Sequence, residues 1–307
     1  MPNPSAQTDS PARTDSEPVL TPGTADSPRG DDRLSQARLA EALISGGFWS
    51  DVRVVPETGS TNADVIAAAE RGAGEGLVLI AESQVAGRGR LGRSWQTPPG
   101  TALTMSVLVR PRSLPATRLG WLPLLAGVAV VEACTSVTDA VEAALKWPND
   151  LLVRPAGAND GAWGKGGGIL AEVADSETIA LGIGINVHQR WDELPTPTDP
   201  QAYPASSLAL AGARCDREQL AIAVLRRLAE WYRRWRDVDG DPDRSGLVAA
   251  YRARCRTLGQ AVTVTLPAGG ALRGTAIDVD SDGCLVVRGA TGEHRLAAGD
   301  VHHVRRQ

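Results

Sequence analysis

Residues 87–95, Gly-Arg-Gly-Arg-Leu-Gly-Arg-Ser-Trp, constrain this chain more than any other segment. Glycine permits φ > 0 and lets the backbone approach a ligand closely, so glycines repeated in a short run predict a loop. Arginine carries a planar fork of donors that fits carboxylate and phosphate oxygens two at a time. Guanidinium groups crowded on one loop repel each other unless an anion lies among them. The segment therefore predicts a loop that closes over a small, multiply anionic ligand, with a solvated basic loop as the alternative.

The same glycines, Gly87, Gly89 and Gly92, also spell the G-x-G-x-x-G pattern of dinucleotide-binding folds, and a strand-like segment at 77–81 precedes them. The rest of that pattern is missing. Residues 95–100, Trp-Gln-Thr-Pro-Pro-Gly, are typical of a loop rather than of a helix start. No acidic residue follows roughly 20 positions on, where it would hold a ribose hydroxyl. A Rossmann site is therefore rejected.

The composition bounds the class of protein. The 307 residues suffice for one large domain and a small one, and 42% hydrophobic residues supply a core. The net charge of −4 argues against general affinity for nucleic acid. The apolar run at 121–133 is too short to span a membrane, and no hydrophobic signal segment begins the sequence. Neither DNA nor a membrane is expected as a partner.

Four cysteines are scattered without a CxxC pair, which indicates reduced thiols in a cytoplasmic protein rather than disulfides or a zinc site. The histidines show no metal-binding spacing, and His302-His303 is expected in a terminal strand. The cysteines are Cys134, Cys215, Cys255 and Cys284.

Three regions of the chain differ in composition and in hydrophobic pattern. Residues 1–32 are rich in Pro, Ser, Thr, Asp and Gly, and we expect a disordered tail there. Residues 33–257 form the large domain. Residues 258–307 alternate apolar and polar side chains between glycines, which is typical of a small SH3-like barrel of four or five short strands. Helices are expected over 33–46, 63–71, 117–137, 216–236 and 243–255, and strands over 52–55, 77–84, 103–109, 142–146, 151–153, 168–173 and 178–187.

A second strong motif is Lys146-Trp-Pro-Asn-Asp150, in which a lysine at a strand end precedes a turn fixed by proline. This arrangement places one ammonium group in a defined position. An ordinary strand-to-turn junction with a solvated lysine is the alternative, and the arginine loop weighs against it. No Walker A lysine exists, since Gly164-Lys165 is followed by glycine, so ATP would have to be held another way.

Three weaker signals accompany these motifs. Ser60-Thr61-Asn62 offers two hydroxyls and an amide at a helix start, either for a ligand or for N-capping alone. Gln84 is either a polar anchor at a strand end or a surface residue. Residues 182–187, Gly-Ile-Gly-Ile-Asn-Val, place glycines inside a strand, where a ligand or another backbone usually approaches closely.

In this order the motifs resemble biotin protein ligases over residues 58–190, with the C-terminal barrel also in place. The resemblance implies an α+β fold: a mixed, largely antiparallel sheet flanked by helices, similar to class II aminoacyl-tRNA synthetases, and a C-terminal SH3-like β-barrel over 258–307. It makes residues 33–257 the catalytic biotin- and ATP-binding domain. The motifs that carry it are Ser60-Thr61-Asn62, Gln84, 87–95, 146–150, 168–172 (Gly-Ile-Leu-Ala-Glu) and 184–187 (Gly-Ile-Asn-Val).

The resemblance implies a reaction in two steps. Biotin is activated by ATP to biotinyl-5′-AMP, and the biotinyl group passes to a lysine of a biotin carboxyl carrier domain of a biotin-dependent carboxylase. Two anions must meet, so the site needs positive charge and exclusion of water. Arg90 and Lys146 are then expected to be catalytic. The implied biotin-binding residues are Ser60, Thr61, Asn62, Gln84, Arg88, Gly89, Arg90 and Lys146, and the implied ATP- or adenylate-binding residues are Arg88, Arg90, Arg93, Trp95 and Asn186.

Mg²⁺ is expected with ATP; its ligands are unknown, and Asn149 and Asp150 are weak candidates. Many bacterial relatives carry an N-terminal winged helix-turn-helix that represses biotin genes. Too few residues precede the catalytic pattern to form that module here, so no repressor function is expected.

Two alternatives stay open. A lipoate ligase would share the fold and the adenylation chemistry, although it lacks the arginine loop. A non-enzymatic biotin- or nucleotide-binding regulator belongs to another class, and the presence of Arg90 and Lys146 argues against it.

Overall fold

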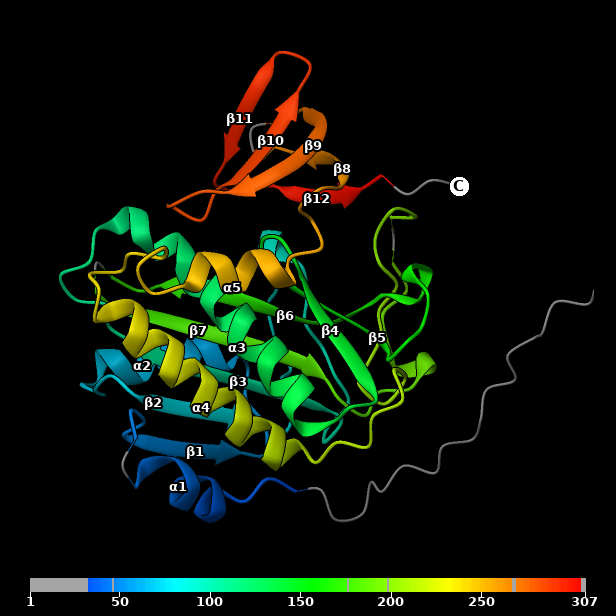
Figure 1. The fold of residues 1–307 in the computed structure, drawn as a ribbon. Helices are drawn as coiled ribbons and strands as arrows, with labels where there is room; N and C mark the ends of the chain where they lie inside the picture. The colour runs from blue at the N-terminus through cyan, green and yellow to red at the C-terminus, as the bar shows by residue number, and fades with distance from the viewer. Residues whose placement is uncertain (1–32, 46, 176, 198, 267–268, 305–307) are drawn as a thin grey trace, which may run out of the picture.

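A computed structural model of the chain describes residues 33–45, 47–175, 177–197, 199–266 and 269–304. The tail expected over residues 1–32 lies outside the described residues. The described part forms a large sheet with helices on both faces and a small sheet above it (Figure 1).

The large sheet has seven strands in the order β1-β2-β3-β7-β6-β5-β4. Only the pair β1 and β2 is parallel, and every other neighbouring pair is antiparallel. This confirms the expected mixed, largely antiparallel sheet. The strands are β1 (Asp51–Val55), β2 (Leu77–Ala81), β3 (Ala102–Val109), β4 (Val141–Lys146), β5 (Asp150–Pro155), β6 (Gly164–Val173) and β7 (Ile179–Asn186).

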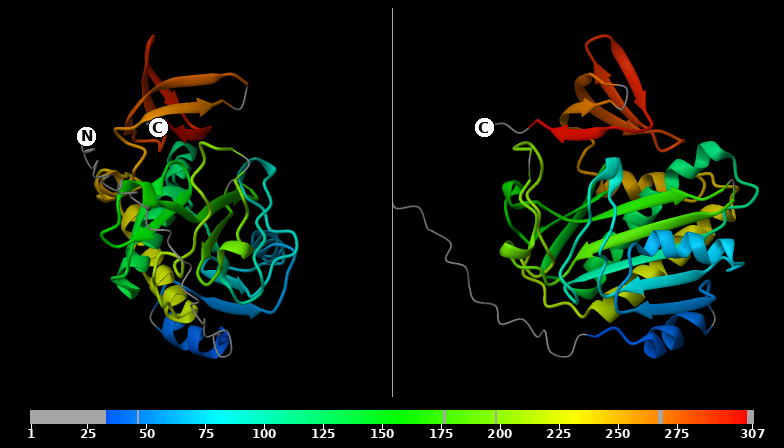
Figure 2. Two further views of the ribbon diagram at one scale, coloured as in Figure 1. Left: turned by 90° about the vertical axis from the view of Figure 1, so that its right-hand side faces the viewer. Right: turned by 180° about the vertical axis from the view of Figure 1, so that it is seen from behind.

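The helices divide unequally between the two faces of this sheet (Figures 1 and 2). One face is covered by α3, which packs on β4 to β7, and by α4, which packs on α3. The other face carries α2, which packs on β2, β3 and β7. That second face is left open over β6 and β5, so it has room for a cavity beside α2. The helices are α1 (Gln36–Ile44), α2 (Thr61–Glu70), α3 (Trp121–Val137), α4 (Arg217–Arg236) and α5 (Leu247–Arg254).

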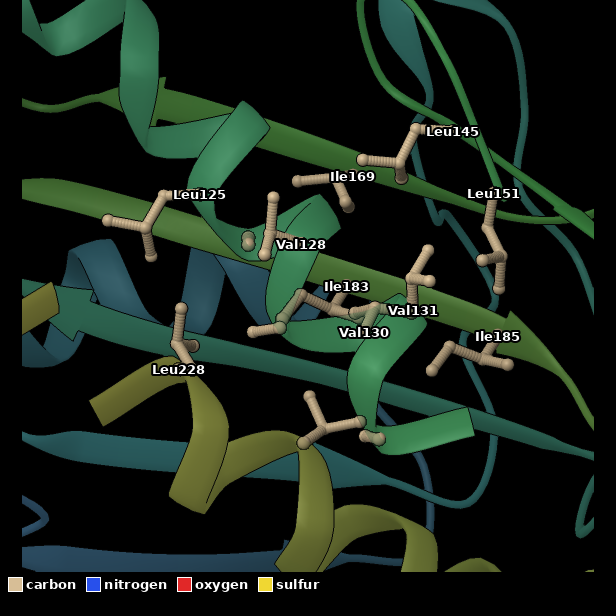
Figure 3. Packing of buried hydrophobic residues seen from close by; sticks show 14 of the residues in the cluster. Leu125, Val128, Val130, Val131, Leu145, Leu151, Ile169, Ile183, Ile185 and Leu228 are labelled. Atoms are coloured by element: carbon tan, nitrogen blue, oxygen red, sulfur yellow. The ribbon is translucent and has the colours of Figure 1, made fainter. Parts of the chain in front are cut away.

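Helix α3 is the centre of the hydrophobic core. Its Leu125 and Val128 lie among Ile169, Ile183 and Ile185 of the sheet in Figure 3. One helical stretch, Ala116–Val137, is long and apolar enough to cross a membrane, which corrects the expectation that no segment reaches that length. In this fold 67% of its most apolar window is buried inside the protein, because the sheet and α4 enclose α3.

The predicted elements all exist, and their ends shift where tertiary contacts intervene. Strand β6 begins at Gly164 rather than at 168, since Lys165 pairs with the backbone of residues 204–206. Helix α5 begins at Leu247 rather than at 243, because Gly246 before it has φ 77°. These contacts lie far along the chain or depend on one dihedral, so local sequence periodicity does not reveal them.

The C-terminal residues form a five-stranded antiparallel sheet in the order β11-β10-β9-β8-β12, as expected for the small SH3-like barrel. Two indole groups of the large domain donate hydrogen bonds to the turn before β10: Trp147 Nε1 to Gly283 O at 3.1 Å and Trp121 Nε1 to Ser281 O at 2.9 Å. The predicted terminal strand that contains His302 is confirmed. The strands are β8 (Ala261–Thr265), β9 (Ala271–Val279), β10 (Leu285–Gly289), β11 (Gly292–Leu296) and β12 (Asp300–His303).

Candidate active site

A cavity of about 740 Å³ lies on the α2 face of the large sheet. Its walls come from the start of α2, the arginine loop, the central strands, residues 193–205 and β12. Every site residue that the sequence suggests lines this cavity, namely Ser60, Thr61, Asn62, Gln84, Arg88, Gly89, Arg90, Arg93, Trp95, Lys146, Asn149, Asp150 and Asn186. The structure therefore brings together motifs that lie up to 126 residues apart, from Ser60 to Asn186.

Two glycines of β7 form the floor of the cavity. Successive strand residues point to opposite faces, so Ile183 enters the core beneath α3 while Gly182 and Gly184 face the cavity. A Cβ atom at residue 182 would lie 2.6 Å from Asn62 Oδ1, and one at residue 184 would lie 2.7 Å from the Trp95 ring. The glycines in this strand therefore admit two side chains that would otherwise collide with the sheet.

One end of the cavity is lined by neutral hydrogen-bonding groups. Gln84 Oε1 accepts hydrogen bonds from the Thr61 backbone N–H at 2.8 Å and from Thr61 Oγ1 at 3.0 Å. The Ser106 hydroxyl lies 2.6 Å from Asn62 Oδ1, and Asn62 Nδ2 donates to Glu172 at 2.7 Å. These side chains are buried or partly buried, so their amide and hydroxyl groups hold one another in fixed orientations.

The N-capping alternative for residues 60–62 is wrong. Ser60 occupies the N-cap position of α2, but its side chain makes no capping hydrogen bond. Helix α2 begins at Thr61, two residues earlier than expected, and this places Thr61 and Asn62 in the cavity wall. Ser106 and Glu172 complete the cluster. Ser106 was missed by sequence reasoning, although a hydroxyl inside the apolar strand β3 is the kind of signal that marks such a site.

The arginine loop extends along the cavity from Glu172 of β6 to Asp300 of β12. Two of its guanidinium groups contact carboxylates: Arg88 Nη2 lies 3.7 Å from Glu172 Oε1, and Arg93 forms an ion pair with Asp300. Arg90 Nη1 donates to Asn149 Oδ1 at 3.5 Å, and burial lowers the pKa of its guanidinium group. Carboxylates on β6 and β12 thus offset part of the repulsion predicted within the loop, and Arg93 still contributes to the lowered pKa of Arg90.

Two lysines in the cavity wall share one carboxylate. Lys146 Nζ lies 3.2 Å from Asp150 Oδ2, and Lys165 Nζ lies 2.5 Å from Asp150 Oδ1. Burial raises the pKa of the Asp150 carboxyl, but the two lysines outweigh burial and hold the pKa below its ordinary value. Asp150 is therefore an anion at neutral pH. Lys165 was missed, because sequence reasoning considered it only as a failed Walker A lysine.

The described residues hold no group of three or more His, Cys, Asp or Glu side chains that could bind a metal ion. The two weak candidates do not fit either. Both Asp150 oxygens contact lysines, and Asn149 donates through Nδ2 to Ile169 O at 3.0 Å while its Oδ1 accepts from Arg90. Around Asn149 and Asp150 the side chains turned to a ligand are cations and amides, so this part of the cavity suits the anionic ligand of a cation rather than the cation itself.

Trp95 and Asn186 both line the cavity and differ in their hydrogen bonding. The Trp95 ring lies over Gly184, with its indole Nε1 buried and without a hydrogen-bond partner in the described structure. The Asn186 amide donates to Ser206 O at 2.8 Å and accepts from Gln189 Nε2 at 3.3 Å. Asn186 thus fixes the segment that pairs with β6, and its expected contact with an adenylate remains a prediction.

The C-terminal sheet contributes a wall that sequence reasoning did not foresee. Strand β12 places Asp300 against Arg93, and His302 Nδ1 lies 2.7 Å from Asp199 Oδ2 in the segment that closes the cavity. These contacts make the C-terminal sheet one wall of the cavity.

The fold and this cavity agree with the family models that match the chain. The model of the biotin/lipoate A/B protein ligase family matches residues 58–189, which contain the arginine loop and the Lys146 motif. The model of the biotin protein ligase C terminal domain matches residues 257–304.

Among the relatives that match most of the chain are proteins named as biotin ligases, whereas the family model also covers lipoate ligases. The chain is 42% identical to the biotin–[acetyl-CoA-carboxylase] ligase of Mycobacterium tuberculosis, over 89% of this chain and 96% of that protein. It is 30% identical to the bifunctional ligase/repressor of Bacillus spizizenii, over 86% of this chain and 79% of that protein. The solved biotin protein ligase of Aquifex aeolicus in complex with biotin and ATP superposes with a TM-score of 0.65 at 25% identity, covering 84% of this chain and all of that one. The chain belongs to the biotin protein ligase family.

Proposed function

We propose that this protein uses ATP to convert biotin to biotinyl-5′-AMP and then transfers the biotinyl group to one lysine of a biotin carboxyl carrier domain. The observation that carries the proposal is the polarity of the cavity. Neutral donors and acceptors around Thr61 and Gln84 line one part of the cavity, and Arg90, Lys146 and Lys165 line another around Asn149 and Asp150. This division matches a neutral ureido ring at one end and two reacting anions at the other.

The chemistry of the first step accounts for the cationic end. A carboxylate oxygen of biotin attacks the α-phosphorus of ATP, the P–O bond to the β-phosphate breaks, and pyrophosphate leaves. Both reactants are anionic, so Lys146 would neutralise the charge that accumulates as they meet, while Arg90 on the loop would hold the adenylate once it has formed. Lys146 is 8% exposed and held by Asp150, so its charge is in place before the reactants arrive.

The second step needs a lysine from outside the cavity. An uncharged amine of the carrier attacks the carbonyl carbon of biotinyl-5′-AMP, an amide bond forms, AMP leaves, and the amine loses a proton. The mixed anhydride must be kept from water between the two steps. We assign this shielding to the arginine loop, since Arg88 and Arg93 are tied to the cavity wall by Glu172 and Asp300.

The polar end favours biotin over lipoate, which the family description does not separate. A ureido ring offers two N–H donors and one carbonyl acceptor, and Thr61, Asn62 and Gln84 present both kinds of partner. The dithiolane ring of lipoate would leave these buried polar groups without partners, which costs binding free energy. ATP–pyrophosphate exchange that depends on biotin and not on lipoate is the expected result, and the reverse dependence would identify a lipoate ligase.

We propose that Mg²⁺ arrives bound to the phosphates of ATP, because the described residues provide no ligand cluster for it. When bound there it would reduce the negative charge of the triphosphate. We place the protein in the cytoplasm, where ATP and reduced thiols occur together. None of the four cysteines, all of them in the described part, forms a disulfide.

A further inference from the structure

Lysine occurs at only two positions in the 307-residue sequence, and both side chains meet at one carboxylate. The two are Lys146 and Lys165, and the other 30 basic residues are arginines. Their Nζ atoms lie 3.2 Å and 2.5 Å from the two oxygens of Asp150. An ammonium group is a compact charge, whereas guanidinium is a planar fork, so the two are not interchangeable at a crowded site. A chain that otherwise uses arginine has lysine where two cations share one anion.

A single lysine beside Asp150 would present little charge to a ligand. A carboxylate that orients an ammonium group also cancels its charge, and in a poorly solvated site the cancelled pair acts only as a dipole. The side chains of Lys146 and Asp150 are only 10% and 15% exposed, so solvent screens them weakly. With Lys165 on the second oxygen, two cations face one anion, and one positive charge remains for the ligand.

We infer that Lys165 is a positioning residue of the reaction: by sharing Asp150 it lets that carboxylate hold Lys146 in place without cancelling the positive charge of the site. The inference rests on the proposed function, in which Lys146 meets the biotin carboxylate and the α-phosphate. Lys165 also lines the cavity, and its side chain is 32% exposed. A direct contact between Lys165 and a phosphate is therefore the competing role that the test has to separate.

A double-mutant cycle separates the two roles. Lys165→Met leaves Lys146 and Asp150 as a pair without net charge. It is expected to lower kcat for biotin-dependent ATP–pyrophosphate exchange at least about tenfold. Adding Asp150→Asn to Lys165→Met restores one positive charge by freeing Lys146, so the double variant should be at least about fivefold faster than Lys165→Met. Lys165→Arg keeps the charge and should be faster than Lys165→Met. A double variant that is no faster, or is slower, than Lys165→Met would overturn the inference.

Because the chain has only two lysines, the NMR signal of the Lys146 ammonium group can show whether the site remains folded in the variant. With ¹⁵N-lysine, Lys165→Met contains a single labelled side chain, that of Lys146. The inference predicts that its ammonium signal persists, because Asp150 still pairs with Lys146. Loss of that signal would show that Lys165 supports the pair structurally and would contradict the charge argument.

Binding of inorganic pyrophosphate, measured by calorimetry without biotin, keeps this test distinct from the proposed function. If the wild-type protein showed no biotin-dependent exchange, the proposed function would fail. Lys165→Met should still weaken pyrophosphate binding, and the added Asp150→Asn should strengthen it again. Unchanged pyrophosphate binding in Lys165→Met would refute the inference whatever the reaction is.

Discussion

At the residue scale, Lys146 and Arg90 are expected to fail in different ways when replaced. Lys146 is buried on Asp150, so Lys146→Gln removes a charge that is fixed before the reactants arrive. The loss of one such contact typically costs about 3 to 4 kcal/mol, or roughly a 10²–10³-fold slower reaction. Pyrophosphate release should therefore fall sharply, and little adenylate should form to escape.

Arg90 lies on the loop and contacts Asn149, so Arg90→Gly should still allow adenylate formation but release biotinyl-5′-AMP faster. Escaped adenylate would label the lysines of an unrelated bystander protein, which mass spectrometry can count. If Arg90→Gly instead abolishes pyrophosphate release and bystander labelling stays at the wild-type level, Arg90 acts in the chemical step alongside Lys146.

Replacing each of the two cavity glycines of β7 should affect the binding of a different substrate. Gly182→Ala places a methyl group against Asn62, and Gly184→Ala places one against the Trp95 ring. Overpacking of this kind typically costs about 1 to 3 kcal/mol. Gly182→Ala should mainly raise the KM for biotin, and Gly184→Ala the KM for ATP. Gly74→Ala, where a Cβ atom meets nothing within 4 Å, is the matched control. Equal effects on both substrates from either variant would contradict the assignment of the two ends.

The site residues that the sequence reveals stand in dense motifs, and those that it does not reveal are isolated charges. Lys146 and Arg90 stand in dense motifs whose residue types are rare together, so the local sequence reveals them. Lys165 and Asp300 lie alone between glycines and other common residues, and only the sheet and the ion pairs bring them to the cavity. Isolated charges of this kind carry no local signal, because their partners are far away in the sequence.

At the scale of elements, the arginine loop is expected to be held at its ends by carboxylates and to tighten when ligand binds. Asp300→Asn removes the partner of Arg93, so amide hydrogen exchange over residues 87–93 should become faster in the free protein. Biotinyl-5′-AMP should slow exchange over the same residues in the wild-type protein. Asp278→Asn, which removes the ion pair between β9 and Arg252 of α5, should leave the loop unchanged. Identical exchange with and without the adenylate would show that the loop is not a lid.

The elements themselves follow from periodicity and turn residues. The side chain of Asp216, at the N-cap of α4, accepts hydrogen bonds from two backbone N–H groups, so a residue type typical of N-caps marks the start of this helix. The apolar runs located α3 and β3 for the same local reasons. The order of strands in the sheet did not follow from these signals, because pairing such as β3 with β7 joins segments about 80 residues apart in sequence.

At the scale of the whole molecule, charge argues that the protein does not share the repressor activity named for some of its relatives. The formal net charge is −4, whereas proteins that bind operator DNA usually present a basic face to its phosphates. A mobility-shift titration at physiological salt should show no sequence-specific complex at submicromolar protein. Sequence-specific, salt-sensitive binding in that range would refute this prediction.

The intact mass of the carrier distinguishes transfer of biotin to a protein from activation of biotin alone. The full chain is incubated with ATP, Mg²⁺, biotin and the carrier domain of a biotin-dependent carboxylase, and the carrier is then weighed intact. We predict that the carrier gains the mass of one biotinyl group on one lysine. No gain is expected when ATP or biotin is omitted or when that lysine is replaced by arginine. A carrier whose mass does not change, although pyrophosphate is released, would limit the protein to biotin activation and contradict the account.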